Sequence, residues 1–451
     1  MQSKIIDEKL INEVKSYISD KNSKYLSRLI DNMRPADLAD LIEHLKREER
    51  IYLFEMLEPE GAGEVLIEIE APIQESIIHD LDNKAITDIV QELDSDDAAD
   101  LVGDLPAERA KDIIETLDET VSDDLEKLLP YDEESAGGIM ALEYVAVKDH
   151  CTIREAIEII KAKREEVENL YYLWVVDDFG KLVGVVSMKD LILEPSERLI
   201  REIMNTEVIS VDVNRDQEEV AQLVKKYDLV AIPVVDEYNR LVGRITHDDI
   251  IDVLEEEADE DISLMAGVMH QEITEDSYIK ISKARLPWLI AGLFGGLLAA
   301  AVINRFEHSI EKLIALAFFF PVIMAMGGNT GTQASTVAVR GLATGDISMV
   351  NVWKRLWVEM KVAMANGLIC GVLLGIVVYF WVGNIGLGLV IAVSLMIIIM
   401  ISGFIGAAVP LVLKRINIDP ALATGPFVTT SNDILSLLIY LGLVTVFLKL
   451  T

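Results

Sequence analysis

The stretch GLGLVIAVSLMIIIMISGFIGAAVPLVL, residues 386–413, contains no charged side chain. A helix of about 20 apolar residues crosses the roughly 30 Å hydrocarbon core of a bilayer. Other apolar stretches long enough for this lie on both sides of it, at 286–303, 313–339, 356–382 and 425–449. The C-terminal part of the chain is therefore predicted to be a polytopic α-helical membrane domain with five transmembrane helices.

Charge is divided unevenly between the two parts of the chain. Residues 1–283 hold 70 Asp and Glu against 30 Lys and Arg, a net charge of −40, whereas the remainder carries +4. Regularly spaced Leu, Ile and Val in the acidic part predict folded structure, because disordered acidic segments lack them. So negative a surface excludes nucleic acid as a partner and favours cations. An acidic surface that only maintains solubility is the alternative.

The charged loops predict how the chain crosses the membrane. The N-terminal residues lack the apolar core of a signal peptide, so we expect the acidic part and its N-terminus to be cytosolic. The inner loops are then 340–355 and 414–420, and their basic residues satisfy the positive-inside rule: Arg340, Lys354, Arg355, Lys414 and Arg415. Five spans place the C-terminus outside. The prediction is a multi-pass protein of the cell inner membrane.

Residues 1–130 show helical periodicity that is interrupted by short acidic or proline-containing turns. LDSDDAADLVGDLPAERAKDIIETL, residues 93–117, places apolar residues at i, i+3, i+4 and i+7. Asp94 and Ser95 are the expected N-cap residues of one helix. Short, related helices in succession predict an acidic N-domain that is an all-α helical superhelix.

A second pattern, of β-rich runs between helical stretches, begins near Tyr144. The runs YVAV, LWVVD and LVGVVS recur as VISVDV, AIPVVD and LVGRIT. The repeat has a constant offset, since Gly243 follows Gly184 at the same interval as Asp249 follows Asp190. This repeated β-α-β-β-α unit resembles a tandem cystathionine-β-synthase (CBS) domain. We expect this α/β region to span 131–252, with modules at about 140–199 and 200–252.

Acidic residues gather in two segments of the first part. Asp96, Asp97 and Asp100 lie at one helix start of the N-domain. An acidic connecting helix is expected at 253–283, before a pore domain at 284–451. Acids crowd its first residues and those just before it: Asp249, Asp252, Glu257, Glu260 and Asp261. Two like charges about 4 Å apart repel by about 4 kcal/mol near a protein surface. Divalent ions would draw such segments together, and this motion would gate a pore.

Asp433 is the acid that lies well within a predicted span, in the segment TGPFVTTSNDILSLLIY. An ionisable residue inside a membrane is costly and is functional by default. Its neighbours are polar, which indicates a helix that faces protein or water: Thr429, Thr430, Ser431, Asn432 and Ser436. The alternative is a structural Asp that binds a neighbouring helix.

The second span carries PVIMAMGGNTGTQAST, residues 321–336. Gly327, Gly328 and Gly331 permit either an unwound turn or close helix approach. The oxygen groups of its polar residues would suit a hydrated ion: Asn329, Thr330, Thr332 and Gln333. Non-helical backbone at this depth is tolerated only beside a pore or inside protein.

The residue types available indicate which cation would pass. Only two cysteines are present, Cys151 and Cys370, and the sequence has no His, Cys or Met cluster of the kind that soft metals prefer. Oxygen groups with one carboxylate suit Mg²⁺, which keeps several of its waters. One Asp per chain is few for a divalent ion, so a homodimer with a shared pore is expected.

Several motifs in a fixed order connect the chain to a known family. They are SAGGIM, the CBS pair, EADEDI, PVIMAMGGNTGTQ, DPALATGP and SNDILSLLIYLGL. With these the chain resembles the MgtE magnesium channels along nearly its whole length. The resemblance implies a homodimer with an N-domain, CBS domains, a plug helix and five transmembrane helices. It implies a Mg²⁺-selective channel that passes Mg²⁺ down its electrochemical gradient into the cytosol and is closed by intracellular Mg²⁺.

The resemblance also implies site residues. Asp433 would bind hydrated Mg²⁺, with Asn329, Thr332 and Asn432 lining the pore. Intracellular Mg²⁺ would bind sensor residues between the N-domain, the CBS domains and the plug helix: Glu64, Asp96, Asp100, Asp216, Glu218, Asp228, Asp249, Asp252, Glu257, Glu260 and Asp261. Asp419, in an inner loop, is a further metal candidate.

The chain differs from the family's pattern at two positions, and the resemblance suggests one further ligand. Thr332 and Gly425 stand where relatives can have Asn, which leaves ion coordination and selectivity open at these points. CBS pairs often hold adenine nucleotides such as ATP. The candidates for a ribose or phosphate are two hydroxyl–carboxyl pairs: Ser187 with Asp190, and Thr246 with Asp249.

Other functions remain as alternatives. A carrier for Mg²⁺, Co²⁺ or Mn²⁺ that works by alternating access would give saturable flux without unitary currents. A nucleotide-responsive membrane sensor without transport would tolerate Asp433→Ala. An enzyme is not expected, because the sequence has no GxSxG, Walker A or HExxH motif.

Overall fold

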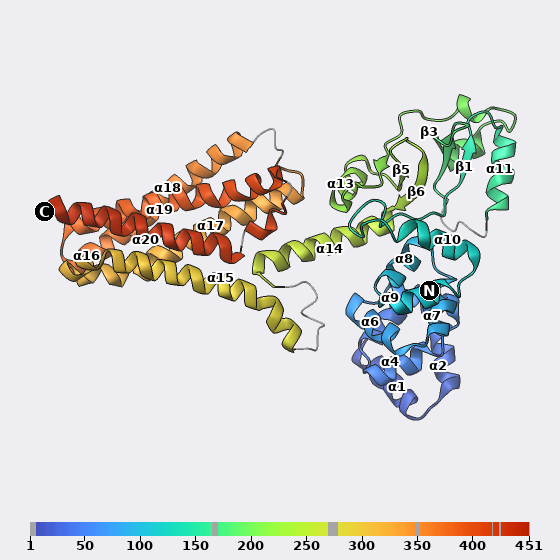
Figure 1. The fold of residues 1–451 in the computed structure, drawn as a ribbon, viewed down its shortest axis with the longest axis horizontal. Coiled ribbons are helices and arrows are strands. Elements are labelled where there is room, and N and C mark those ends of the chain that lie inside the picture. The colour runs from blue at the N-terminus through green and yellow to red at the C-terminus, as the bar shows by residue number, and fades with distance from the viewer. Residues whose placement is uncertain are drawn as a thin grey trace. The chain divides into compact units, whose positions relative to one another are not determined.

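The computed structural model divides the chain into two units, Met1–Glu255 and Glu256–Thr451. The first unit holds short helices and two small sheets, and the second holds the long helices (Figure 1). This is the multidomain architecture that the sequence predicts. The structure describes residues 6–164, 170–268, 278–347, 352–416, 418–423 and 425–450.

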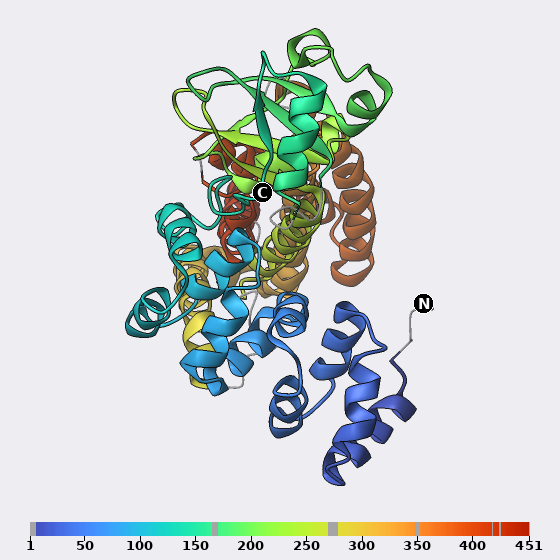
Figure 2. The same ribbon diagram turned by 90° about the vertical axis from the view of Figure 1, so that its right-hand side faces the viewer.

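The N-domain is built from short helices that follow one another along the chain, from dark blue to cyan in Figure 2. Acidic side chains start several of them: Asp7 accepts a hydrogen bond from the Leu10 N–H at 2.8 Å, and Asp82 accepts one from Ala85 at 2.8 Å. Alternate helices pack together, α3 on α5, α5 on α7 and α7 on α9, which confirms the superhelix. The bounds are α1 Glu8–Ser19, α2 Ser23–Ile30, α3 Pro35–Glu43, α4 Arg47–Phe54, α5 Pro59–Ile67, α6 Ala71–Asp80, α7 Asn83–Val90, α8 Ser95–Gly103, α9 Ala107–Ile114 and α10 Glu119–Leu128.

The CBS region contains two three-stranded sheets of the same topology, β1-β2-β3 and β4-β5-β6. In each sheet the first pair of strands is parallel and the second pair is antiparallel. Asp177 and Asp236, at matching positions of the repeat, close equivalent turns by accepting the N–H groups of Lys181 at 2.9 Å and Arg240 at 2.8 Å. The bounds are β1 Ala146–Lys148, α11 Ile153–Ala162, β2 Tyr172–Val176, β3 Leu182–Ser187, α12 Met188–Leu193, η1 Ile200–Glu202, β4 Val211–Asp212, α13 Gln217–Tyr227, β5 Ala231–Val235 and β6 Leu241–Thr246.

The SAGGIM motif, residues 135–140, fastens the end of the N-domain to the second CBS module. The N–H of Ala136 donates to the Arg215 carbonyl at 2.6 Å, and that of Gly137 donates to Val213 at 2.8 Å. A Cβ atom on Gly137 would be 2.7 Å from the ring of Tyr131. The backbone therefore approaches so closely that glycine is needed.

Ser95 makes a second connection within the first unit. Its buried hydroxyl donates to the Glu143 carboxylate at 2.8 Å and accepts the N–H of Leu142, also at 2.8 Å. The start of α8 is thus tied to the segment that leads into β1.

One helix, α14 (His247–Ala266), continues directly from β6 and carries the acidic linker sequence. It ends at Gly267, whose φ of +70° is left-handed and favours glycine at a helix C-terminus. The acidic helix therefore begins within the range predicted for the second CBS module.

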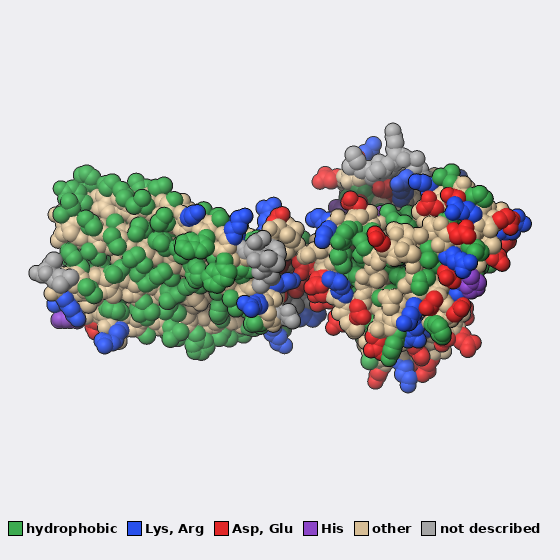
Figure 3. All heavy atoms as spheres, turned by 90° about the horizontal axis from the view of Figure 1, so that it is seen from above, with side chains coloured by type: hydrophobic (Ala, Val, Ile, Leu, Met, Phe, Trp, Pro, Cys, Tyr) green, Lys and Arg blue, Asp and Glu red, His purple; other side chains and the backbone are tan. Residues whose placement is uncertain are grey.

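The second unit contains five apolar helical segments long enough to span a membrane among its described residues, which confirms that prediction. In this unit α19 packs on α17 and α18, and α20 packs on α15, α17 and α19. Figure 3 shows hydrophobic side chains covering these helices, in contrast to the charged surface of the first unit. The bounds are α15 Tyr278–Arg305, α16 Glu307–Lys312, η3 Ile314–Phe319, α17 Phe320–Ala343, α18 Val352–Val382, α19 Ile385–Arg415, η5 Ala421–Ala423 and α20 Gly425–Leu450.

Helix α18 marks the two edges of the apolar zone. Exposed Trp353 and Trp357 lie near its start, and exposed Phe380 and Trp381 lie at its end. Trp357 and Trp381 are about 36 Å apart at a helical rise of 1.5 Å per residue. This matches a bilayer core with aromatic side chains at both of its interfaces.

Candidate functional site

Asp433 lies about 12 Å from the start of α20, on a partly buried side of the helix. On α17 it faces Gly328: a Cβ atom on that glycine would be 3.7 Å from Asp433 Oδ1. The methyl group of Thr429 lies at 3.9 Å from the same point. The carboxylate therefore sits at the contact between α17 and α20, inside the apolar unit.

Helix α17 has two faces of different chemistry. Gly327, Gly331 and Ser335, spaced four residues apart, are buried. Asn329, Gln333 and Thr336 are exposed on the opposite face, and Thr332 is partly exposed beside them. Spacings of three and four residues put these polar groups on one side of the helix. A polar stripe thus runs along an otherwise apolar unit, next to Gly328 and Asp433.

The structure decides between the two roles open to the glycines of α17. The helix is continuous from Phe320 to Ala343, so the alternative of an unwound turn is wrong. A Cβ atom on Gly327 would collide with the Ser436 hydroxyl, and one on Gly331 would collide with the Asn432 amide. The glycines allow α20 to pack closely, in the manner of small residues at membrane helix interfaces.

Asn432, which the sequence predicts to line the pore, is buried within the second unit. Its side chain is 0% exposed and packs against Gly331. Successive side chains on a helix point about 100° apart, so Asp433 and Asn432 point to different sides of α20. Within this unit Asn432 belongs to the helix packing, whereas Asn329 and Thr332 reach the surface of α17.

Two further residues that the sequence singled out in the second unit are Asp419, just before η5, and Gly425, the first residue of α20. Asp419 is exposed and accepts the N–H of Ala421 at 2.7 Å, which shapes the turn into η5. Gly425 is in close contact with the end of α14, because a Cβ atom there would be 2.9 Å from the carbonyl oxygen of Met265. Glycine at this position therefore permits an approach that a larger residue would block.

Carboxylates from α8 and α14 converge in the first unit. Burial, and then the charges of Asp97 and Asp249, raise the pKa of Asp96 well above its usual range. Burial followed by the charges of Asp249 and Asp94 raises the pKa of Asp97 to about 7. The pKa of Asp249 is also raised by burial, against the effect of its hydrogen bonds from Thr246. Like charges are thus held together where a bound cation would stabilise them.

Four acids that sequence analysis did not include among the sensor candidates contribute to this acidic cluster: Asp94, Asp97, Asp248 and Glu143. The first three lie within two residues of a candidate, so the clustering of acids at two helix starts was a usable signal. Glu143 is far from Asp96 in the sequence, and only the fold brings the two close.

The other predicted sensor residues of the first unit are placed differently. Asp252 is exposed on α14, and its negative charge helps to raise the pKa of Asp97. Asp100 is exposed on α8. Asp216 caps α13 and accepts the Glu219 N–H at 3.3 Å. The remaining ones are Glu64, exposed on α5, Glu218, partly buried on α13, and Asp228, the left-handed C-cap of α13 with a φ of +51°.

Glu257, Glu260 and Asp261 lie on the C-terminal half of α14, which is part of the second unit. Among the residues that the structure describes, no three His, Cys, Asp or Glu side chains are arranged to hold one metal ion. The acidic cluster is compatible with hydrated Mg²⁺, which is held through few carboxylates while its waters make the other contacts.

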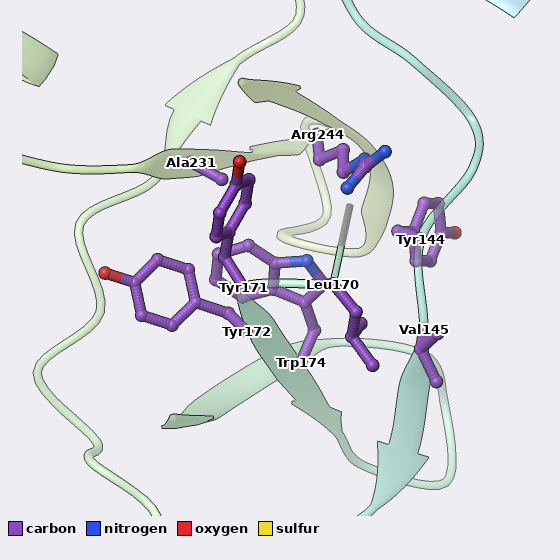
Figure 4. Close-up of a pocket in the computed structure, with 8 residues that line it drawn as sticks. All are labelled: Tyr144, Val145, Leu170, Tyr171, Tyr172, Trp174, Ala231 and Arg244. Atoms are coloured by element: carbon purple, nitrogen blue, oxygen red, sulfur yellow. The ribbon is translucent and has the colours of Figure 1, made fainter. Parts of the chain in front are cut away.

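A cavity between the two CBS modules is rich in aromatic side chains. Trp174 and Tyr172 come from β2, Arg244 comes from β6, and Tyr171 precedes β2 (Figure 4). Aromatic faces stack on planar bases, and a guanidinium group pairs with phosphate. The full lining is Tyr144, Val145, Leu170, Tyr171, Tyr172, Trp174, Ala231 and Arg244.

The residues predicted to bind a ribose or phosphate form hydrogen bonds at the N-termini of two helices. The hydroxyl of Ser187 donates to Asp190 at 2.6 Å, and that of Thr246 donates to Asp249 at 2.7 Å. The two pairs occupy equivalent positions of the repeat, at the starts of α12 and α14. They are outside the cavity lining, whose signal in the sequence was the aromatic run YYLW at residues 171–174.

Three family models match this chain. The MgtE model, described as a divalent cation transporter, matches residues 320–443. The MgtE intracellular N domain matches residues 33–134, and the CBS domain matches residues 136–197 and 200–256. The matches cover both units.

Curated relatives align along nearly the full chain. The magnesium transporter MgtE of Bacillus subtilis is 37% identical over 449 residues, which is 99% of each chain. The magnesium transporter MgtE of Thermus thermophilus is 36% identical over 450 residues, 98% of this chain and 100% of the relative.

Two solved structures resemble the first unit. The soluble part of a magnesium transporter shares 30% identity with a TM-score of 0.50, covering 56% of this chain and 99% of that one. The cytosolic domain of the Mg²⁺ channel MgtE in complex with ATP shares 35% identity with a TM-score of 0.51, covering 54% and 100%.

Proposed function

This chain belongs to the MgtE family of magnesium transporters, and we propose that it is a homodimeric, Mg²⁺-selective channel. Mg²⁺ passes down its electrochemical gradient into the cytosol. Intracellular Mg²⁺ closes the pore by binding the acidic residues of the N-domain, the CBS domains and α14. The N-terminus and the CBS domains lie in the cytosol, and the C-terminus lies outside the cell inner membrane.

The observation that carries this proposal is the position of Asp433 next to the polar face of α17. Exposed amide and hydroxyl groups at Asn329, Gln333 and Thr336 would be costly against lipid. Water and a second copy of the chain are the partners that remove this cost. A twofold arrangement brings two Asp433 carboxylates to one path, where a hydrated Mg²⁺ binds them through its waters.

The surface of the CBS modules supports the homodimer. Ile192, Leu193 and Ile251 are 76%, 71% and 57% exposed. Ile192 and Ile251 occupy equivalent positions of the repeat, on α12 and α14. Large apolar side chains exposed in both modules indicate a protein interface. We assign this interface to a second copy of the chain.

The acidic cluster supplies the regulation. In the absence of Mg²⁺, repulsion among Asp96, Asp97 and Asp249 disfavours the arrangement that holds them together. Bound Mg²⁺ neutralises these charges and thereby stabilises the arrangement in which the three carboxylates lie close together. Because Asp249 lies on α14, the same helix whose end contacts Gly425, cation binding is coupled to the start of α20. Glu64, Asp100, Asp216, Glu218, Asp228, Asp252, Glu257, Glu260 and Asp261 are the further proposed sensor acids, and Asp419 is a further proposed metal ligand.

ATP is a second proposed ligand, at the aromatic cavity of the CBS region. The related cytosolic domain is known in complex with ATP. Here the partly exposed rings of Tyr171 and Tyr172 offer stacking surfaces, and the buried Arg244 adds a positive charge to an acidic domain. The nucleotide would act as a regulator, since nothing in the proposed transport requires its hydrolysis.

Reconstitution tests the transport function. Liposomes containing the full chain and a Mg²⁺-sensitive dye should take up Mg²⁺ along its gradient without ATP. Asp433→Ala should abolish uptake, while Asp346→Ala, at an exposed acid beyond the end of α17, should not. Equal uptake by wild type and Asp433→Ala would return Asp433 to a structural role, whereas no uptake by wild type would favour a nucleotide-responsive sensor without transport. Saturable uptake without unitary currents would favour the divalent-cation carrier.

A further inference from the structure

Helices α17 and α20 are joined by two successive contacts between a glycine and a polar side chain. Gly327 faces Ser436, and Gly331 faces Asn432, so closely that a Cβ atom on either glycine would overlap the polar group. The two glycines are four residues apart, as are Asn432 and Ser436, and the order is reversed. The helices are therefore antiparallel and in one defined register.

The polar members of these contacts are buried without hydrogen bonds. Asn432 is 0% exposed and Ser436 is 1% exposed. Within the described residues, neither polar atom of the Asn432 amide has a hydrogen-bond partner, and neither does the Ser436 hydroxyl. Burying such groups lowers stability. Stability alone would thus favour alanine at position 432.

Gly331 is also where a third helix approaches. A Cβ atom on Gly406 of α19 would overlap the carbonyl oxygen of Gly331. Asn432 therefore packs onto a point where α17, α19 and α20 meet. Sliding or rotating α20 would move its amide out of the space above Gly331 and into neighbouring side chains.

We propose that Asn432 is a positioning residue for Asp433 and thereby sets ion selectivity. Its amide locks α20 against Gly331, and this keeps the next residue, Asp433, beside Gly328 and the polar face of α17. The inference rests on the proposed role of Asp433 in the ion path. It adds that selectivity depends on a side chain that does not touch the ion.

The test compares flux of Mg²⁺ and Ca²⁺ through the full chain in liposomes, together with its thermal unfolding midpoint. Asn432→Ala should lower the Mg²⁺-to-Ca²⁺ flux ratio about tenfold, because small displacements of a positioned group cost up to ~100-fold. The unfolding midpoint should be unchanged or higher, since a buried polar group is removed. A merely structural residue would instead lower the midpoint and leave the ratio intact.

Two further variants test the contact itself. Gly331→Ala should lower flux by displacing the amide, and adding Asn432→Ala should restore flux but not the ratio. Gly442→Ala, on α20 with open space around the glycine, is the matched control and should behave as wild type. A folded Asn432→Ala protein with the wild-type ratio overturns the inference. Asp433→Ala is measured in parallel: wild-type flux there contradicts the proposed function itself, whatever the result at Asn432.

Discussion

The carboxylate of Asp433 on α20 faces the backbone of Gly328 on α17, with Oδ1 3.7 Å from where a Cβ atom would lie. That separation is an ordinary van der Waals distance, so alanine fits and a larger side chain does not. We expect Gly328→Ala to keep Mg²⁺ uptake within about twofold of wild type and Gly328→Leu to reduce it about tenfold or more, since a small misplacement costs that much. Uptake into liposomes measures both. Equal loss in the two variants would indicate that the glycine is needed for folding instead.

The acidic cluster predicts how pH affects stability in the cytosolic region. Between the ordinary carboxyl pKa of 3.8 and about 7 for Asp97, the folded state binds more protons than the unfolded state. The free energy of unfolding therefore falls as pH rises through this range. Without Mg²⁺, a fragment of residues 1–268 should melt at a higher temperature at pH 5.5 than at pH 8. Mg²⁺ should raise the melting temperature more at pH 8.

The substitution Asp97→Asn tests whether Asp97 causes this pH dependence of stability. It should flatten the pH dependence and stabilise the metal-free fragment by at most about 4 kcal/mol, the equivalent of three pKa units. Asp112→Asn, at an exposed acid of α9, is the matched control and should change neither quantity. A melting temperature that rises from pH 5.5 to pH 8 without Mg²⁺ would contradict the clustering of these acids.

The aromatic cavity predicts an optical signal for nucleotide binding. Trp174 lines the cavity, and the other four tryptophans of the chain lie after residue 283. Fluorescence of the 1–268 fragment therefore reports on Trp174 alone. ATP should quench it with saturation, and Tyr171→Ala should weaken binding about tenfold, since one stacking contact is worth about 1–3 kcal/mol. Phe179→Ala, on an exposed turn, should bind as wild type, and quenching that never saturates would exclude a site here.

Gly425 predicts a link between α14 and the pore helix. A side chain there would collide with the carbonyl of Met265, 2.9 Å from its Cβ position, and displace the end of α14. Gly425→Val should therefore transport Mg²⁺ even when Mg²⁺ inside the liposomes is high enough to silence wild type. Gly442→Ala should remain silenced. If Gly425→Val is silenced as well, closure does not depend on this contact.

Periodic features of the sequence predicted most of the fold. Five apolar stretches predicted five spans, and the constant offset between matching positions predicted two CBS modules whose turns at Asp177 and Asp236 are indeed equivalent. Such features depend on local periodicity and length, which a single sequence displays. Asp433 was recognisable for a similar reason, because a carboxylate in an apolar helix is conspicuous.

The site's geometry was less predictable, because it depends on which side of each helix is covered. Asn432 and Asp433 are adjacent in sequence, and only the packing of Gly331 against α20 shows that the first is buried. Likewise Glu143 joins the acidic cluster through the fold that brings Leu142 against Ser95. These contacts join residues distant in the sequence and leave no local pattern.

Current recording tests most directly the claim that Asp433 lies in a Mg²⁺ path. Membrane patches containing wild type or Asp433→Ala would be recorded while Mg²⁺ on the cytosolic side is stepped from near zero to about 10 mM, a millimolar range suited to weak carboxylate sites. We predict unitary Mg²⁺ currents in wild type that close at high cytosolic Mg²⁺, and currents that vanish or lose Mg²⁺ selectivity in the variant. Unitary Mg²⁺ currents of unchanged selectivity in Asp433→Ala would contradict the account.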